Sequence, residues 1–381
     1  MSAPLAQELR DALTSLAAAH RRRSPKTLSG APASRTQIDG AQRVNFASNN
    51  YLGLAEDPRV RRAAAQAARR WGGGATASRL MGGTLSLHRE LEAEIADLKR
   101  CPAALVFPSG YHANTGMIPA LAGPEDTIFL DRLAHASLVD GARLSRARLK
   151  VFRHNDPDDL DRVLARTTGP GRRWVVTESV FSMDGDRAPL PDIVAVSERR
   201  GARTYVDEAH GTGVWGPDGS GGINAFGLTG RVDVAMGTLS KAFAAQGGFV
   251  CGSVELIDWA VNRARAFIYS TALAPAAAAA ALAALRIARS EPARRDRLFA
   301  LSRRLREGLG ATGEGPIVPF RVGADDAAVA LSQRLWDRGL FAPAVRPPTV
   351  PKGTARVRFS LTAAHTEADI DAAVAAVRES L

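Results

Sequence analysis

The chain has 381 residues and a formal net charge of +11, with 45% hydrophobic and 23% charged residues. This length can bury a large core, and the composition is that of an ordinary globular protein. The two cysteines, Cys101 and Cys251, form no CxxC pair and no HExxH motif occurs, which excludes a thiolate metal centre and a zinc hydrolase of that type. The excess of basic residues favours anionic partners, either nucleic acid or small molecules that carry phosphate.

The first 26 residues predict an amphipathic helix followed by a basic cluster. They lack an uninterrupted apolar segment and carry Glu8 and Asp11, so they do not resemble a signal peptide. The longest apolar run, TALAPAAAAAALAAL, is mostly alanine and too short to cross a bilayer, and Pro275 within it suits the start of a helix. We therefore expect a soluble, cytoplasmic protein.

Short β-branched runs alternate with helical patterns in the middle of the chain. Strands are predicted at 104–107, 127–130, 149–152, 174–177, 203–207, 232–237 and 247–252, with helices such as 158–166 and 192–200 between them. Such alternation predicts an α/β fold with a mostly parallel, seven-stranded sheet covered on both faces. Ligands of such sheets bind at the carboxyl ends of the strands.

The pattern changes after the alanine-rich helix. PIVPFRV and ARVRFSL predict strands within a region of arginine-rich helices, which indicates a smaller α+β domain. We predict an N-terminal helix and arm at 1–50, a large domain at 51–286 and a small C-terminal domain at 287–381.

The stretch VAMGTLSKAFAAQGGFVCGS, residues 234–253, contains Lys241 and no other charged residue, although only five of the 50 basic residues are lysines. An apolar, partly buried setting lowers the pKa of a lysine from about 10.4 and leaves a neutral amine. A neutral amine forms a Schiff base with an aldehyde, which a guanidinium does not. The alternative is an amine that extends into solvent, but Thr238 and Ser240 beside it offer hydroxyl donors to a phosphate.

A second candidate follows the strand at 203–207, in the segment DEAHGTG. Side chains two apart on a strand share a face, so Asp207 and Ala209 point the same way. Asp207 can hold a protonated ring nitrogen while Ala209 lets the ring lie close and His210 reaches its edge. Taken alone, a strand end with a glycine turn explains the segment equally well. DEAH also names a helicase motif, but no GxxxxGK[ST] phosphate loop occurs.

A carboxylate for a ring nitrogen, a lysine for an aldehyde and hydroxyls for a phosphate together indicate pyridoxal 5′-phosphate. In FPSGYHANTG, Ser109, Gly110 and Tyr111 lie between a strand and a helix, where free backbone N–H groups bind phosphate. His135, in FLDRLAHAS, can stack on the ring, although a buried core histidine is the alternative. In TESVFSMDGD, Glu178 and Ser182 follow the next strand, and Ser182 either bonds the phenolic oxygen of the ring or serves a turn.

These motifs, in this order, resemble the α-oxoamine synthases, a family of fold-type I pyridoxal-phosphate transferases. The resemblance extends nearly from end to end through NFASNNYLGL, SRLMGGTLSLHRELE, FPSGYHAN, TESVFSMDGD, VDEAHGTGVWG, TLSKAFAAQGG, YSTALAP and VRPPTVPKGTARVRFSLTAAHT. One departure is that LSKAFAAQGG has serine and alanine where relatives often have glycine. The side chains remain small, so we expect function to persist.

The resemblance implies a role for each matched residue. Lys241 forms the Schiff base and then acts as acid and base, Asp207 pairs with the pyridinium and His135 stacks. The catalytic residues are Lys241, His135, Asp207 and His210, and the further cofactor-binding residues are Gly110, Tyr111, Ser182, Thr238, Ser270 and Thr271. Ser270 and Thr271 reach the cofactor of the second subunit, which implies a homodimer with shared active sites. The substrate-binding residues are Asn49, His135, Arg346, Thr349 and one arginine of 21–23, of which Arg21 matches the family pattern.

The resemblance also implies an activity. RPPTVP, residues 346–351, is most similar to the members of biotin biosynthesis, which condense L-alanine with a pimeloyl thioester of coenzyme A or acyl carrier protein and release carbon dioxide. The alternative is a glycine-using member that makes 5-aminolevulinate or 2-amino-3-ketobutyrate. A nucleic-acid-binding protein is less favoured, because aromatic residues are only 6% and no recognition motif occurs.

Overall fold

The computed structural model describes residues 3–380, which fold into two compact units. The first unit contains the residues up to 48, residues 183–185 and those from 297 on, and the second contains 49–182 and 186–296. This division differs from the three consecutive parts predicted with boundaries at 50/51 and 286/287. The N-terminal arm belongs with the C-terminal segment because strand β2 (Ala41–Asn45) pairs with β11 (Leu340–Phe341) in one sheet.

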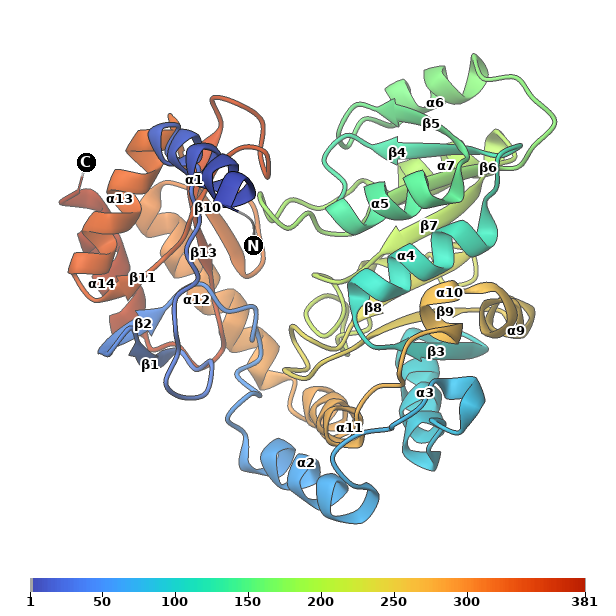
Figure 1. Cartoon of the computed structure of the whole chain (residues 1–381), viewed down its shortest axis with the longest axis horizontal. Helices are drawn as coiled ribbons and strands as arrows, with labels where there is room; N and C mark the ends of the chain where they lie inside the picture. Colours follow the sequence, from blue (N-terminus) through green and yellow to red (C-terminus); the bar gives the residue numbers. More distant parts are fainter. Residues whose placement is uncertain (1–2, 381) are drawn as a thin grey trace. The chain divides into compact units, whose positions relative to one another are not determined.

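The second unit is built on a seven-stranded sheet with the order β3-β9-β8-β7-β6-β4-β5 (Figure 1). Its strands are β3 Ala103–Phe107, β4 Thr127–Asp131, β5 Arg148–Phe152, β6 Arg173–Glu178, β7 Arg203–Asp207, β8 Val234–Thr238 and β9 Gly248–Gly252. Only β9 is antiparallel to its neighbours, β3 and β8. The predicted mostly parallel sheet of seven strands is confirmed, and each predicted strand overlaps an observed one.

Burial on both faces explains why these strands are visible in the sequence. Strands β4, β8 and β9 are buried at every position, so their sequences read as continuous apolar runs instead of alternating ones. On one face, Trp174 and Val176 of β6 join a core cluster with Met117 and Leu138. Val175 between them is equally buried and points to the opposite face.

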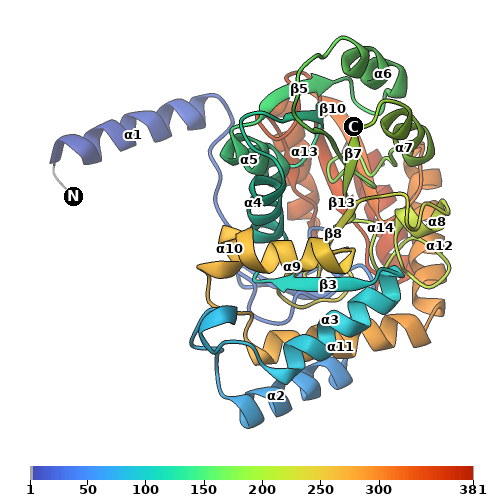
Figure 2. The same cartoon turned by 90° about the vertical axis from the view of Figure 1, so that its right-hand side faces the viewer.

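Helices cover both faces of this sheet. The helices of the second unit are α2 Pro58–Trp71, α3 Ser86–Lys99, α4 Gly110–Leu121, α5 Ala136–Ser145, α6 Pro157–Ala165, α7 Leu190–Arg199, α8 Gly222–Ala225, α9 Val254–Arg263, α10 Arg265–Ile268 and α11 Pro275–Ser290, with a 3₁₀ turn at Arg79–Met81. Helices α4 and α5 pack along one face and α7 packs against β7 (Figure 1). Helix α11 packs against α2 and α3 (Figure 2), and Pro275 starts α11 as predicted.

The first unit is an α+β assembly with two small sheets. Its strands are β1 Arg35–Ile38, β2, β10 Ile317–Gly323, β11, β12 Ala344–Val345 and β13 Ala355–Ser360, and its helices are α1 Ala3–Ala18, α12 Ala293–Leu309, α13 Asp325–Asp337 and α14 Glu367–Arg378. The sheets have the orders β1-β2-β11 and β10-β13-β12. The predicted strands PIVPFRV and ARVRFSL correspond to β10 and β13, and the predicted N-terminal helix to α1. The boundary of the units falls within α12.

The structure contains no helix between residues 3 and 380 that is both long and apolar enough to cross a membrane.

Candidate functional site

A cavity of about 170 Å³ opens in the second unit at the carboxyl ends of its parallel strands. Its walls come from the loops after β3, β4, β6, β7 and β8. The lining residues are Ser109, Gly110, Tyr111, Asn114, His135, Ser137, Glu178, Asp207, Ala209, His210, Met236, Thr238, Ser240 and Lys241. The cavity thus gathers seven of the predicted cofactor and catalytic residues: Gly110, Tyr111, His135, Asp207, His210, Thr238 and Lys241.

Asp207 ends β7 with a carboxylate that is held in a fixed orientation. The residue is 3% exposed, its Oδ2 accepts a hydrogen bond from Asn114 Nδ2 at 2.8 Å, and its Oδ1 accepts the Ala209 N–H at 2.8 Å. The Tyr205 hydroxyl donates to Asn114 Oδ1 at 2.8 Å, which fixes the orientation of the amide. Burial, and next the charge of Asp207, raise the pKa of Tyr205 well above its ordinary value, so Tyr205 remains a donor.

His135 precedes α5 and presents a neutral ring to the cavity. Its Nδ1 accepts the Ser137 backbone N–H at 3.2 Å and lies 2.7 Å from Ser137 Oγ, so the ring proton is assigned to Nε2. Burial lowers the pKa of His135; Asp207 raises it and Lys241 lowers it further. The uncharged imidazole is therefore favoured, as a ring that stacks on a flat cofactor requires.

Glu178 ends β6 beside His135 and Asp207. Its Oε1 accepts the His135 backbone N–H at 2.7 Å, and the residue is 2% exposed. Burial, and next the charge of Asp207, raise the pKa of Glu178 well above its ordinary value. The raised pKa favours the protonated form of Glu178 at this place.

Lys241 lies in the tight loop between β8 and β9 and is half-buried. Its charge acts on both His135 and Glu178, which places its amine among the other polar groups of the cavity. The Thr238 and Ser240 hydroxyls lie 2.7 Å apart, and Thr238 donates to the Gly247 carbonyl oxygen at 2.9 Å. The apolar setting predicted for this lysine is provided by Leu239, Ala242 and Phe243, all buried.

The start of α4 offers a set of backbone donors. Ser109 precedes the helix, and its side-chain oxygen accepts the His112 N–H at 3.2 Å, which leaves the first N–H groups directed out of the helix end. Strand β9 approaches this turn closely, since a Cβ atom at Gly248 would lie 2.5 Å from the Gly110 nitrogen. Glycine at 248 is therefore required by the path of the α4 N-terminus.

His210 is connected to a residue predicted to bind substrate. The Tyr51 hydroxyl lies 2.6 Å from His210 Nδ1 and 3.2 Å from Asn49 Oδ1. Tyr51 is fully buried, so this connection is shielded from solvent. Asn49 does not line the cavity, but the Tyr51 side chain connects it to His210.

The remaining predicted residues lie outside the cavity. In the second unit, Ser182 is half-buried in the loop after β6, and Ser270 and Thr271 lie between α10 and α11, where Thr271 pairs with Ser78. Leu80, Met81 and Tyr269 nearby are 53%, 81% and 71% exposed.

In the first unit, the segment that contains Arg21 lies beside the loop that contains Arg346 and Thr349. Arg346 donates to the His20 carbonyl oxygen, Arg23 Nη2 donates to Thr349 Oγ1 at 3.2 Å, and Arg21 pairs with Asp325 at 3.3 Å. Burial lowers the pKa of Arg346, and the charge of Arg23 acts in the same direction. Arg21, Arg346 and Thr349, all predicted to bind substrate, thus lie in one region of the first unit.

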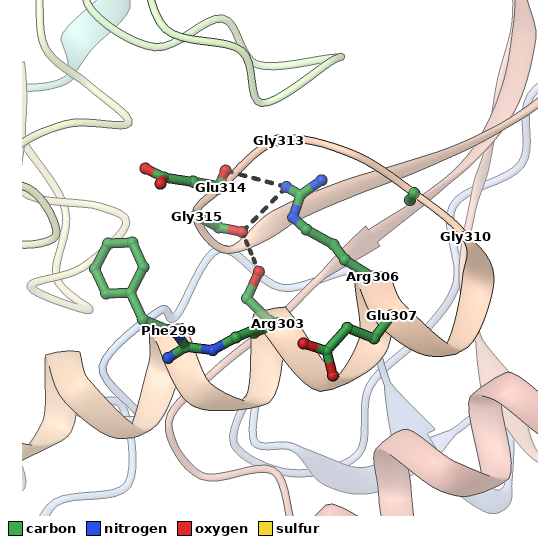
Figure 3. Close-up of a pocket in the computed structure, with 10 residues that line it drawn as sticks. Phe299, Arg303, Arg306, Glu307, Gly310, Gly313, Glu314 and Gly315 are labelled. Atoms are coloured by element: carbon green, nitrogen blue, oxygen red, sulfur yellow. Dashed lines mark hydrogen bonds between the residues drawn. The ribbon is translucent and has the colours of Figure 1, made fainter.

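A larger hollow of about 580 Å³ lies in the first unit between α12 and the loop that follows it (Figure 3). Arg306, 5% exposed, closes this loop by donating to the carbonyl oxygens of Glu314 and Gly315 at 3.0 and 3.3 Å. Ser302 Oγ also donates to the Gly315 oxygen. These contacts explain the hollow as a consequence of how the loop is held, and it contains no nucleophile beside a base. The smaller cavity of the second unit contains the lysine and the histidines that this hollow lacks.

The donor set of the smaller cavity fits pyridoxal 5′-phosphate. Each oxygen of the Asp207 carboxylate receives one N–H and has capacity for another, which suits a pyridinium N–H. The amine of Lys241 suits the aldehyde, and the α4 N-terminus with the Thr238 and Ser240 hydroxyls suits the phosphate. All three functional groups of the cofactor therefore have a complementary group in one cavity.

Comparison with known proteins identifies the family. Residues 41–377 match the family described as aminotransferase class I and II. A curated relative from Anaeromyxobacter dehalogenans, strain 2CP-1, named 8-amino-7-oxononanoate synthase, is 50% identical over 362 residues, which cover 93% of this chain and 91% of the relative. The chain belongs to the 8-amino-7-oxononanoate synthase family. A relative of the same name from Geobacter sulfurreducens is 47% identical and covers 93% of each chain.

Solved structures agree with this membership. Serine palmitoyltransferase from S. paucimobilis, solved with bound PLP and myriocin, has a TM-score of 0.93 and 33% identity, and the match covers 98% of this chain and 96% of that one. The 8-amino-7-oxononanoate synthase from Francisella tularensis has a TM-score of 0.75 and 27% identity, with 88% and 97% covered. The fold-type I expectation is confirmed, as is the resemblance to the α-oxoamine synthases.

Sequence reasoning missed three buried polar residues that the structure of this 8-amino-7-oxononanoate synthase family member places behind the predicted ones. Asn114 and Tyr205 orient Asp207, and Tyr51 contacts His210. The sequence contains one usable signal: Asn114 lies four residues after Gly110 in FPSGYHANTG, one helical turn along the same face of α4.

Proposed function

We propose that this chain binds pyridoxal 5′-phosphate and condenses L-alanine with a pimeloyl thioester, releasing carbon dioxide and giving 8-amino-7-oxononanoate. The carrier of the acyl group is coenzyme A or an acyl carrier protein. The observation that carries the proposal is the cavity that unites Asp207, His135, His210 and Lys241 at the strand ends. Its support is strengthened by relatives at 45–50% identity that bear the synthase name.

When bound, pyridoxal 5′-phosphate withdraws electrons from the α-carbon of the amino acid. Asp207 would hold a proton on the ring nitrogen, because its carboxylate is buried and oriented by Asn114 and Ala209. The raised pKa of Glu178 favours its protonated form, so Glu178 would not compete with Asp207 for that proton. His135, whose lowered pKa favours the uncharged imidazole, would cover one face of the ring and keep water from it.

Lys241 has two roles in the proposal. Its Nζ would hold the aldehyde group of the cofactor as the covalent anchor. The same amine would serve as the base that takes the α-carbon proton of the amino acid and as the acid that gives a proton back. A lysine suits both roles because its neutral form is a nucleophile and a base.

The substrate-binding residues are proposed from their chemistry. Arg346 and one arginine of 21–23 pair with carboxylates, since a guanidinium donates two parallel hydrogen bonds to a carboxylate. Asn49 and Thr349 offer further polar groups for the substrate. The contact of Asn49 with Tyr51, and of Tyr51 with His210, supports a link between substrate and cofactor residues.

A homodimer completes the proposal. Ser270 and Thr271 do not line the cavity of their own subunit, and we assign them to the phosphate of the second subunit's cofactor. Leu80, Met81 and Tyr269 around them form an exposed apolar surface, which supports an interface at this place.

The test is covalent labelling followed by a substrate comparison. The purified protein is expected to be yellow, and borohydride is expected to fix the cofactor to the peptide that contains Lys241, while Lys241→Ala is not labelled. Release of thiol is then measured with L-alanine or glycine and with pimeloyl or short acyl thioesters. Faster release with glycine and a short thioester would overturn the substrate assignment. A colourless protein without a labelled peptide would overturn the cofactor assignment.

A further inference from the structure

Lys99 is a second lysine that needs an explanation, and the proposed mechanism does not use it. It ends α3, its side chain is 1% exposed, and it does not line the cavity. Its ammonium group donates to the Glu208 carboxylate and the Ser220 carbonyl oxygen, and it lies 3.3 Å from Thr212 Oγ1. An ammonium has three N–H donors, and all three have an acceptor here.

Glu208 connects this lysine to the active site. It is fully buried, and its Oε1 accepts the Ile223 N–H at 2.8 Å. Its backbone N–H donates to the Met236 carbonyl oxygen at 2.7 Å, and its own carbonyl oxygen accepts the N–H groups of Gly211 and Thr212 at 2.9 and 2.8 Å. Glu208 therefore organises the turn at 207–212 through both its side chain and its backbone.

The contact between Lys99 and Glu208 matters because Glu208 lies in the same turn as the residues that line the cavity. Glu208 lies between Asp207 and Ala209, and successive side chains alternate in direction, so Glu208 points away from the cavity that Asp207 and Ala209 line. His210 follows on the same turn. The groups behind the turn are closely packed. A Cβ atom at Gly221 would lie 2.6 Å from Glu208 Oε2 and 2.7 Å from Lys99 Nζ.

We propose that Lys99 is a positioning residue of the active site: through Glu208, Thr212 and Ser220 it holds the turn at 207–212 that presents Asp207 and His210 to the cavity. The consequence for cofactor binding rests on the proposed function. Lysine suits this place better than the arginine that this chain otherwise prefers, because a tetrahedral ammonium directs donors to three separate residues while a guanidinium is planar.

The test uses Lys99→Met, which keeps most of the side-chain volume and removes the charge. Because this leaves Glu208 buried without its cation, Lys99→Met/Glu208→Gln serves as a second variant in case the first does not fold. Arg306→Met is the matched control. It removes an equally buried cation that also holds a loop through carbonyl oxygens, but in the first unit, where no residue lines the cavity (Figure 3).

Two measurements decide the proposal. Hydrogen–deuterium exchange of the apoprotein is expected to be at least about ten-fold faster at 207–223 in the Lys99 variants, and Arg306→Met is expected to change exchange only around 310–317. Titration with pyridoxal 5′-phosphate is expected to show a dissociation constant raised about three-fold to ten-fold, with a shifted pH midpoint of the cofactor's absorption, in the Lys99 variants alone.

Each outcome has one meaning. Unchanged exchange at 207–223 in a folded Lys99 variant would overturn the proposal. Faster exchange with an unaltered dissociation constant and pH midpoint would reduce Lys99 to a purely structural residue, and would also overturn it. Failure of the wild-type protein to bind pyridoxal 5′-phosphate would count against the proposed function, while the exchange measurement would still decide whether Lys99 holds the turn.

Discussion

Asp207 shows how much of the candidate site depends on the partners of a single side chain. Its two oxygens receive N–H groups from Asn114 and Ala209, and Asn114 is in turn oriented by Tyr205. The carboxylate therefore keeps a fixed direction, which is what a group that holds a proton on a ring nitrogen requires.

Replacing Asp207 by alanine is expected to affect turnover more than cofactor affinity. The cavity keeps Lys241, His135 and the helix N-terminus, so the dissociation constant of pyridoxal 5′-phosphate should change by less than about ten-fold, whereas kcat should fall by about 10²–10⁴-fold. The measurement is kcat from thiol release beside a cofactor titration. A variant with near-normal kcat would contradict the role given to this carboxylate.

His154 forms a second charged cluster, also in the second unit. Its Nδ1 lies 2.9 Å from Asp131 Oδ1 and its Nε2 lies 2.7 Å from Asp186 Oδ2, so both ring nitrogens donate and the imidazolium form is favoured. Asn155 donates to the same two carboxylates. Burial alone would lower the pKa of His154, but the hydrogen bonds and charges of Asp131 and Asp186 outweigh it and raise the pKa to about 10.

This cluster predicts a loss of stability in alkaline solution. The pKa of His154 is raised from an ordinary 6.5 to about 10, so its contribution is complete below about pH 6.5, decreases as the pH rises and is lost above about pH 10. The free energy of unfolding in denaturant, measured from pH 6 to pH 10.5, should therefore converge for the wild type and His154→Gln as the pH rises. Two curves that stay parallel over this range would show that His154 does not titrate as described.

At the scale of elements, the sequence was informative where burial leaves a simple pattern. Strands β4, β8 and β9 are wholly buried and were predicted from their apolar runs. Strands β1 and β2 were not predicted, because RTQI and AQRVN are short, mix polar and apolar residues and are buried at only some positions. The strand order was also beyond prediction, since β9 inserts between β3 and β8 through pairing that local sequence does not encode.

In the candidate site, too, some residues could be predicted from the sequence and others could not. Side chains that follow a strand, such as Asp207, His135 and Lys241, were predictable because strand ends meet at one edge of the sheet. Their partners were not predictable, because a hydrogen bond such as that between Asn114 and Asp207 joins residues 93 apart in the chain. The Lys99–Glu208 pair, 109 residues apart, was missed for the same reason.

The contact between β9 and the start of α4 supports a prediction about Gly248. A Cβ atom at Gly248 would lie 2.5 and 2.6 Å from the nitrogen and Cα of Gly110, and this backbone cannot move without displacing the helix N-terminus. Gly248→Ala is therefore expected to cost about 1–3 kcal/mol of stability. It should also raise the dissociation constant of pyridoxal 5′-phosphate at least about ten-fold, because the displaced N–H groups no longer converge on the phosphate.

Gly123→Ala, in the loop after α4, is the matched control, since a Cβ atom there meets nothing within 4 Å. Thermal unfolding and cofactor titration of both variants provide the comparison. Equal cofactor affinity in the two variants would show that the α4 N-terminus does not bind the phosphate.

At the scale of the whole molecule, the chain does not divide into consecutive domains. Residues 183–185 belong to the first unit although the residues on either side belong to the second. Asp184 explains why this segment belongs to the first unit, because it accepts hydrogen bonds from Arg321 at 2.8 Å and from the fully buried Arg356. Local composition at MDG carries no sign of two arginines that follow more than 130 residues later.

The proposed homodimer predicts that two inactive variants restore activity in each other. Lys241→Ala removes the anchor of a chain's own cavity, whereas Ser270→Ala/Thr271→Val removes the groups that the same chain would offer to its partner. In a mixed dimer, one site combines both defects, and the other combines an intact Lys241 with intact Ser270 and Thr271 from the opposite chain.

After the two variants are mixed at equal amounts and allowed to exchange subunits, half of the dimers are mixed, and each of these holds one intact site. Activity is therefore expected to rise from near zero to about a quarter of the wild-type value. Mixing two preparations of Lys241→Ala provides the control and should restore nothing. If every site were built from one chain alone, the mixture of the two variants would gain no activity, because each chain would carry its own defect into every assembly that it forms.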